Sequence, residues 1–197
     1  MQNKTKTTVK KHKKIKLNRR GQFCLLLLLL ALFLWLLGSK YLPYWLYPTP
    51  YYDEIVMQAE KAGIDPELLL AVAKVESNFR PDAVSPVGAI GIMQLMPDTG
   101  AWLAKRNGEE ASVEQLYEPA YNIRLGAEYL RFLLDYWDWD LPKAIASYNA
   151  GQSKVDLWLT EGVWDGSFDN ADDIPYEETR DYLKKVTEVY RQYTRLY

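Results

Sequence analysis

Apolar residues recur at helical spacing beyond residue 52. Over residues 53–62 they follow the three-to-four-residue period of a helix, and Gly63 stands where a helix commonly ends. Asp65 is a suitable N-cap for the next segment, which begins with proline. That segment, residues 66–79, is apolar on most of its circumference and ends before Pro81. We therefore expect it to be a central helix.

Further segments share this period, and a short turn with capping-box spacing, Ser112 to Gln115, lies among them. The predicted helices are residues 97–106, 119–136, 142–150, 151–160 and 176–196. No stretch alternates over four or more residues in a context that suggests a sheet, and only a small hairpin within residues 162–174 is left open. The pattern after residue 52 is typical of an all-α domain.

The N-terminal part has a different pattern. Residues 23–37 are apolar throughout, FCLLLLLLALFLWLL, and an aromatic cluster follows. Fifteen helical residues reach roughly 22 Å, short of the ~30 Å hydrocarbon core, but the residues that follow bring the span close to sufficient. We predict one transmembrane signal anchor over residues 21–42 and a Pro/Tyr-rich spacer over 43–52. A cleaved signal peptide is the alternative, although no Ala-x-Ala site follows Leu37.

Charge is divided unevenly along the chain. Nine Lys and Arg lie within residues 1–20, and no Asp or Glu precedes Asp53. The positive-inside rule therefore predicts a basic cytoplasmic tail over residues 1–20 and places residues 53–197 outside the cytoplasmic membrane. From Asp53 onward, 14 Lys and Arg face 26 Asp and Glu, a formal charge of −12. This excess of acidic residues speaks against a nucleic-acid partner.

Residue types limit the chemistry. Cys24 is the only cysteine, and the only histidine, His12, lies in the basic tail. Residues 53–197 therefore offer no disulfide, no Ser-His or Cys-His pair, and no histidine- or cysteine-ligated metal site. We expect no cofactor and no metal, and chemistry that depends on carboxylates, hydroxyls, amides and the backbone.

Glu76 is the first candidate for such chemistry. It continues the apolar face of the predicted 66–79 helix, seven residues after Leu69 and four after Val72. A carboxyl group with little water around it favours its protonated form, as a general acid requires. The alternative interpretation is a surface ion pair with Arg80, four residues later.

The run SPVGAIGIMQLMP, residues 85–97, is the second candidate feature. Gly88 and Gly91 allow a close approach of the backbone to a ligand, and Gln94 suits hydroxyl and acetamido groups. The alternative is an ordinary loop that contains glycine.

Five segments together resemble a known family. They are ESNF at 76–79, GIMQLMP at 91–97, NIRLGAEYL at 122–130, ASYNAG at 146–151 and IPYEETRDYL at 174–183. In this order they resemble the soluble lytic transglycosylase (SLT) domain family, glycoside hydrolase family 23, over roughly residues 60 to 190. The resemblance implies a goose-type lysozyme-like helical domain within residues 53–197. It also implies a bacterial enzyme that cleaves the β-1,4 bond between N-acetylmuramic acid and N-acetylglucosamine in the glycan strands of peptidoglycan.

The resemblance also implies roles for particular residues. Glu76 takes the position of the catalytic acid/base, and Glu178 that of a second carboxylate in the cleft. The positions expected to bind the glycan are Ser85, Gln94, Met96, Thr99, Tyr148 and Asn149. Two departures from the family pattern are Ser147 in place of alanine and Tyr176 in place of phenylalanine. Structural interpretations stay open: Tyr148 as a core aromatic with a bonded hydroxyl, and Glu178 as a charge at a helix N-terminus.

The implied reaction uses one glutamate. Protonated Glu76 donates to the leaving oxygen, and its carboxylate then takes the proton of the muramoyl C6 hydroxyl, which attacks C1 and leaves a 1,6-anhydro end. Two alternatives remain: a muramidase that hydrolyses the same bond, and a non-catalytic scaffold that binds the wall.

Overall fold

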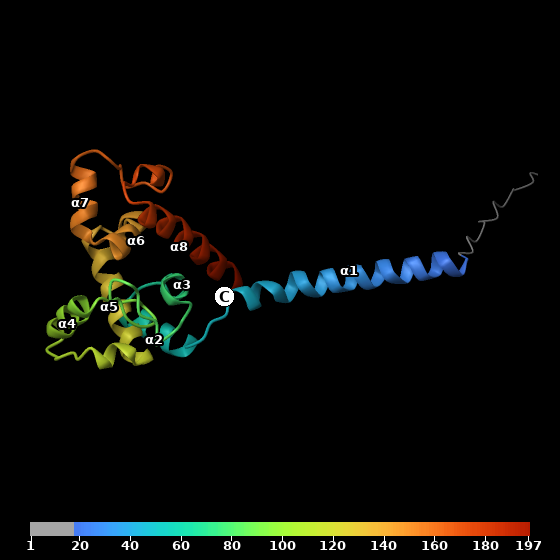
Figure 1. Ribbon diagram of the computed structural model, residues 1–197, viewed down its shortest axis with the longest axis horizontal. Coiled ribbons are helices and arrows are strands. Elements are labelled where there is room, and N and C mark those ends of the chain that lie inside the picture. Colours follow the sequence, from blue (N-terminus) through green and yellow to red (C-terminus); the bar gives the residue numbers. More distant parts are fainter. Residues whose placement is uncertain (1–17) are drawn as a thin grey trace, which may run out of the picture. The chain divides into compact units, whose positions relative to one another are not determined.

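The computed structural model describes residues 18–197, and most of the predicted basic tail therefore lies outside the described residues. The chain divides into two compact units, one ending at Leu46 and one from Tyr47 to Tyr197. The described part of the first unit is essentially one helix, α1 (Arg19–Leu46) (Figure 1). Each unit is described separately below.

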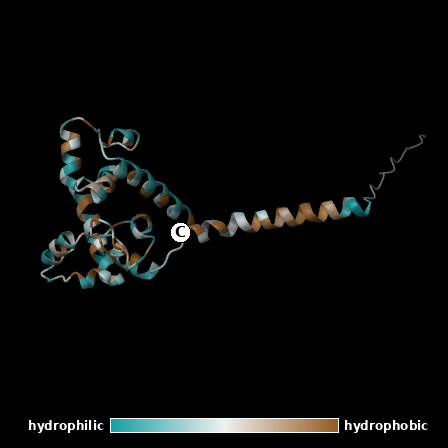
Figure 2. Ribbon diagram, viewed as in Figure 1, coloured by the Kyte–Doolittle hydropathy of each residue, from teal (hydrophilic) through white to brown (hydrophobic). Residues whose placement is uncertain are grey.

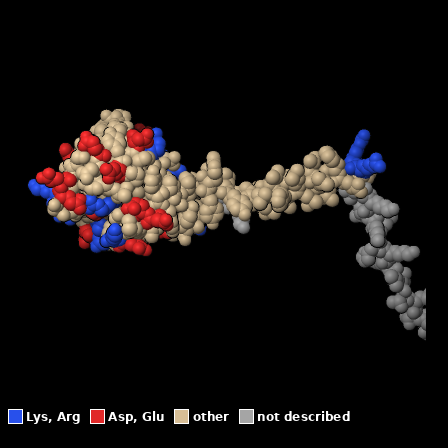
Figure 3. Space-filling model, turned by 90° about the horizontal axis from the view of Figure 1, so that it is seen from below, with Lys and Arg blue, Asp and Glu red and all other residues tan. Residues whose placement is uncertain are grey.

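Helix α1 is apolar on all sides. Its segment Gln22–Ser39 has a mean hydropathy of 2.3 and is long and apolar enough to cross a membrane, a test that a signal sequence also passes. Figure 2 shows this hydrophobic stretch with a hydrophilic first turn. Figure 3 shows Lys and Arg atoms at that first turn. The helix continues to Leu46, so the first residues of the expected spacer 43–52 are helical.

The second unit is all-α, as predicted. Its α-helices are α2 (Tyr52–Ala62), α3 (Pro66–Ser77), α4 (Pro97–Arg106), α5 (Pro119–Tyr136), α6 (Leu141–Ala150), α7 (Gln152–Thr160) and α8 (Glu177–Leu196). Two 3-10 turns, η1 (Glu114–Tyr117) and η2 (Ala171–Asp173), lie between them. No strand occurs within residues 18–197, where the only β-pairing is two isolated bridges in the 84–95 loop. The hairpin left open for residues 162–174 is therefore absent, and turns and η2 occupy that segment.

Local signals set the helix boundaries. Asp65 Oδ1 accepts a hydrogen bond from Glu67 N at 2.9 Å and caps α3. The predicted helix 66–79 ends two residues early, because Asn78 and Phe79 have φ of 54° and 63°. Their N–H groups bond back to the Lys74 and Ala73 carbonyls, the usual satisfaction of a helix C-terminus.

Helix α3 lies at the centre of the second unit. All six residues from Leu68 to Ala73 are buried, and α8 packs along α3 and also contacts α6. Helix α5 packs against α2, α4 and α6 (Figure 1). Two hydroxyls fix α8 in place: Tyr190 donates to Asp65 Oδ2 at 2.6 Å, and Tyr193 donates to Pro48 O at 2.8 Å.

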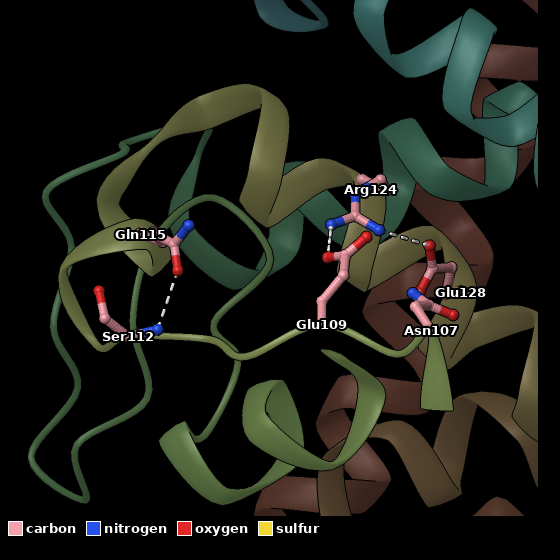
Figure 4. Close-up of polar contacts among 6 residues, drawn as sticks. All are labelled: Asn107, Glu109, Ser112, Gln115, Arg124 and Glu128. Atoms are coloured by element: carbon pink, nitrogen blue, oxygen red, sulfur yellow. Dashed lines mark hydrogen bonds and ion pairs between the residues drawn. The ribbon is translucent and has the colours of Figure 1, made fainter. Parts of the chain in front are cut away.

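Polar contacts fix the connection between α4 and α5 (Figure 4). The predicted capping interaction is half formed, since Ser112 N donates to Gln115 Oε1 at 2.9 Å. Arg124 on α5 pairs with Glu109 at 2.6 Å and with Glu128 at 3.3 Å. This connection therefore stays on the surface and is held to α5 by charge.

Candidate active site

Glu76 lies in the last turn of α3 and is half-buried. Its Oε1 atom accepts a hydrogen bond of 2.6 Å from the Tyr182 hydroxyl of α8. The alternative surface pair with Arg80 does not form among the described residues; Arg80 Nε instead donates to Ser77 O at 3.0 Å. Glu76 is thus directed toward the packing of α3 against α8.

The surroundings of Glu76 change its acidity. The pKa of Glu76 is raised from 4.5 to about 7. Burial is the largest cause of the rise, the Tyr182 hydrogen bond opposes it, and the negative charge of Glu178 adds to it. Near neutral pH the protonated and ionised forms are therefore both well populated. A group in this condition can donate a proton and later accept one.

Two tyrosines lie next to this carboxyl group. Tyr148 of α6 is buried and donates to the Met93 carbonyl at 2.9 Å, which agrees with its interpretation as a core aromatic. Burial, then the charge of Glu76, raise the pKa of both Tyr148 and Tyr182 well above the ordinary value. Both hydroxyls therefore stay protonated, and both lie close enough to Glu76 for its charge to raise their pKa.

Ser85 and Gln94 shape the loop between α3 and α4. Ser85 Oγ accepts from Ala89 N at 2.9 Å. Gln94 has φ of 48°, and its Nε2 donates to Gly91 O at 2.9 Å and to Ala83 O at 3.1 Å. Two of the residues expected to bind glycan therefore also support the loop. The Oε1 acceptor of Gln94 has no protein partner within residues 18–197.

Asn122 of α5 locks this loop in place, and the sequence interpretation missed it. It is buried: its Oδ1 accepts from Met93 N at 2.7 Å, and its Nδ2 donates to Leu116 O at 2.8 Å and Ile90 O at 3.0 Å. Gly91, with φ of 81°, passes so close that a Cβ there would lie 2.5 Å from Asn122 Nδ2. The sequence feature that could have indicated Asn122 is its place on the buried face of the predicted helix 119–136.

Asn149 connects α6 to the start of α8. Thr179 Oγ1 donates to Asn149 Oδ1 at 2.7 Å, and Asn149 Nδ2 donates to Glu178 Oε1 at 3.5 Å. Glu178 is exposed in the first turn of α8, which agrees with its interpretation as an N-terminal helix charge. Its effect on Glu76 also makes it part of the electrostatics of the site.

Met96 and Thr99 lie at the start of α4. Met96 is exposed, and Thr99 lines a cavity of about 300 Å³ with Trp102, Tyr129 and Gln152. Glu76 lines a different cavity, of about 550 Å³. The structure thus brings Glu76, Tyr148 and Glu178 together. Thr99 lines a different cavity from Glu76, although the Tyr129 ring of that cavity lies 5.1 Å from the Tyr148 ring.

Tyr182 is the second residue that sequence reasoning missed. It belongs to the IPYEETRDYL segment, four residues after Glu178, and therefore lies on the same side of α8. A hydroxyl at that spacing from a candidate carboxylate was the signal that could have indicated it.

Comparisons with known proteins identify the family of the domain. Residues 53–166 match the family described as "Transglycosylase SLT domain". The soluble lytic murein transglycosylase of Salmonella typhimurium is 34% identical over 145 residues, 71% of this chain and 22% of that protein. The membrane-bound lytic murein transglycosylase C of Actinobacillus pleuropneumoniae is 32% identical over 158 residues, 68% of this chain and 43% of that protein. The chain therefore spans less than half the length of these relatives.

Solved structures agree in fold as well. The 70 kDa soluble lytic transglycosylase of Escherichia coli matches with a TM-score of 0.72 and 31% identity, over 76% of this chain and 25% of that one. An inactive mutant of the lytic transglycosylase Slt of Pseudomonas aeruginosa matches with a TM-score of 0.70 and 34% identity, over the same shares. With the family match over more than half of its residues, this chain belongs to the transglycosylase SLT domain family.

Proposed function

We propose that this chain is a peptidoglycan lytic transglycosylase. It cleaves the β-1,4 bond between N-acetylmuramic acid and N-acetylglucosamine without water and leaves a 1,6-anhydromuramoyl end. The observation that carries the proposal is Glu76, a half-buried carboxyl group with a pKa of about 7 at the end of the central helix. Relatives named lytic murein transglycosylases support it.

Glu76 performs both proton transfers. In its protonated form it donates to the glycosidic oxygen as the bond from C1 to that oxygen breaks. The 2-acetamido group of the same sugar stabilises the positive charge at C1. The Glu76 carboxylate then accepts the proton of the C6 hydroxyl as O6 bonds to C1. This last step benefits from proximity, because both reacting atoms belong to one sugar.

The neighbouring residues orient Glu76 and hold the glycan. The Tyr182 hydroxyl stabilises the ionised form of Glu76 after the first proton transfer. The Oε1 atom of Gln94 accepts from a sugar hydroxyl or acetamido N–H. Tyr148, Asn149 and Glu178 contact the glycan close to Glu76. We assign the remaining glycan contacts to Ser85, Met96 and Thr99, each at a different position along the glycan strand.

The chain acts from the bacterial cytoplasmic membrane. Helix α1 crosses it once, the basic tail remains in the cytoplasm, and residues 53–197 reach the wall outside. Support comes from the apolar segment Gln22–Ser39 and from the charge difference between its two ends.

Product analysis of digested wall tests the activity. We expect mass spectrometry to find muropeptides that end in 1,6-anhydro-N-acetylmuramic acid, one water lighter than hydrolytic products. Glu76→Gln keeps the shape of the side chain, so we expect a folded chain whose rate falls by about 10²–10⁴-fold or more. Hydrolytic products would indicate a muramidase. Unchanged sacculi after addition of the wild-type chain would indicate a non-catalytic scaffold.

A further inference from the structure

The cavity that Glu76 lines lies between the end of α3 and the middle of α8. Its volume is about 550 Å³. Helix α3 and the turn after it contribute Lys74, Glu76 and Arg80, and α8 contributes Lys185. Among the described residues that line it, Glu76 is the only carboxylate, so three cationic side chains surround a single acid.

These three cations have unused hydrogen-bonding capacity. None of them forms an ion pair with any residue from 18 to 197. Lys74 Nζ donates to Asn78 Oδ1 at 2.5 Å, and Arg80 uses only its Nε atom, toward Ser77 O. The two terminal nitrogens of Arg80 and the Lys185 ammonium group have no hydrogen-bond acceptor in the described part of the chain.

This concentration of cations contrasts with the rest of the domain. From Asp53 onward the formal charge is −12, and Figure 3 shows separate groups of acidic side chains on the visible face of the domain, with basic groups among them. Elsewhere in the domain, Arg124, Arg131, Lys143, Lys184 and Arg191 are ion-paired with neighbouring acids. Six other cationic side chains of the domain form no ion pair within residues 18–197 and do not line this cavity: Lys61, Lys105, Arg106, Lys154, Arg180 and Arg195. Unpaired cations gathered in a hollow next to the candidate catalytic group have the character of an anion site.

We infer that this cavity binds a carboxylate of the stem peptide on the muramoyl residue next to the cleaved bond, through Lys74, Arg80 and Lys185. The inference rests on the proposed function, because the stem peptide is attached to the same sugar that Glu76 acts on. A guanidinium group binds a carboxylate through two parallel hydrogen bonds, and ammonium groups add further donors.

The cavity shares Glu76 with the proposed catalytic centre, so a peptide carboxylate bound there holds the muramoyl sugar close to this residue. A glycan strand stripped of its peptides by an amidase keeps only the lactyl carboxylate next to the sugar ring and lacks the more distant carboxylates of the peptide, which this site is inferred to bind.

The test compares two substrates and three full-length proteins. The substrates are glycan strands with their stem peptides and the same strands stripped of peptides by an amidase. The proteins are the wild type, the variant K74Q/R80Q/K185Q, and a control, K61Q/K105Q/R195Q, that removes three positive charges outside the cavity. The readout is kcat/KM for formation of anhydro ends on each substrate.

We expect the wild type to prefer peptide-bearing strands and K74Q/R80Q/K185Q to lower that preference at least about tenfold, chiefly through KM. The control keeps the wild-type preference. Lys185→Glu alone, on the exposed face of α8, lowers it as well, which guards against misfolding of the triple variant. An unchanged preference in both cavity variants, or an equal loss in the control, overturns the inference.

The proposed function can be judged separately in the same experiment. Anhydro ends released from stripped strands support lytic transglycosylase activity even if the preference for peptides is absent. Binding of stripped and peptide-bearing strands to the Glu76→Gln chain, measured by co-sedimentation, tests the carboxylate site without any turnover. Equal binding to both strands contradicts the inference and leaves the proposed activity standing.

Discussion

Glu76 holds its proton more strongly than an ordinary glutamate because its side chain is partly buried where the end of α3 packs against α8. Burial is the largest cause, and Tyr182 opposes it with a hydrogen bond that favours the ionised form. Together with the negative charge of Glu178, these effects place the pKa of Glu76 at about 7. The balance between them can be altered one residue at a time.

The pH dependence of activity follows from this balance. A general acid must be protonated, so we expect kcat/KM to fall as pH rises through about 7. Tyr182→Phe removes the hydrogen bond that lowers the pKa, and the alkaline limb should therefore move to higher pH. Tyr148→Phe is the control, since the Tyr148 hydroxyl bonds to Met93 O and not to Glu76. A limb that moves to lower pH in Tyr182→Phe would contradict this account.

The same pKa affects stability. Between pH 4.5 and about 7 the folded chain keeps a proton at Glu76 that the unfolded chain releases, so the free energy of unfolding falls as pH rises through this interval. The loss is at most about 3 kcal/mol. We expect Glu76→Gln, which cannot ionise, to be more stable than the wild type above pH 7, with no such advantage below about pH 4.5. Thermal unfolding at several pH values measures this. A variant less stable than the wild type at alkaline pH would sink the idea.

At the scale of elements, the loop between α3 and α4 depends on α5. Asn122 binds three backbone groups around it, and Gly91 fits only because it has no side chain. The loop carries Ser85, Gln94 and the Met93 carbonyl that Tyr148 contacts. Its conformation therefore determines where several candidate site groups lie.

Two glycines with similar backbone angles allow the effect of steric crowding on stability to be distinguished from the effect of backbone strain. Gly91 has φ of 81° and Gly108 has φ of 74°, but a Cβ at Gly108 would meet nothing within 4 Å. Gly108→Ala should cost only the strain of a left-handed residue, about 1–2 kcal/mol. Gly91→Ala adds the clash with Asn122 and Leu116 O, so we expect a larger loss of stability together with lower activity. Chemical unfolding measures both losses, and equal values would refute the close packing.

The sequence predicted most elements well, for local reasons. Helices α4 and α5 have the predicted bounds. Each begins at a proline, and each ends where the helical spacing of apolar residues ends in the sequence. The predicted end of α3 was two residues too late, because Asn78 and Phe79 adopt left-handed backbone conformations. Periodicity identified Glu76 and its apolar face. It could not identify Tyr182, because that contact joins residues 106 positions apart.

For the whole molecule, the proposed membrane topology places residues 53–197 outside the cytoplasm, and this can be tested directly. We expect protease added to intact spheroplasts to digest residues 53–197 and to spare a tag fused before residue 18. Both regions should be digested once detergent opens the membrane. An N-terminus found beyond Leu37 by mass spectrometry of the mature chain would indicate cleavage of a signal peptide, the alternative stated above.

The partner of Glu76 comes from α8, the last helix of the chain, and this order has a consequence for biosynthesis. While the ribosome is still extending the chain, the acid has been made but the hydroxyl that supports it has not. The proposed active site therefore stays incomplete until α8 has been synthesised, and a product that stops before α8 lacks the hydroxyl that supports Glu76.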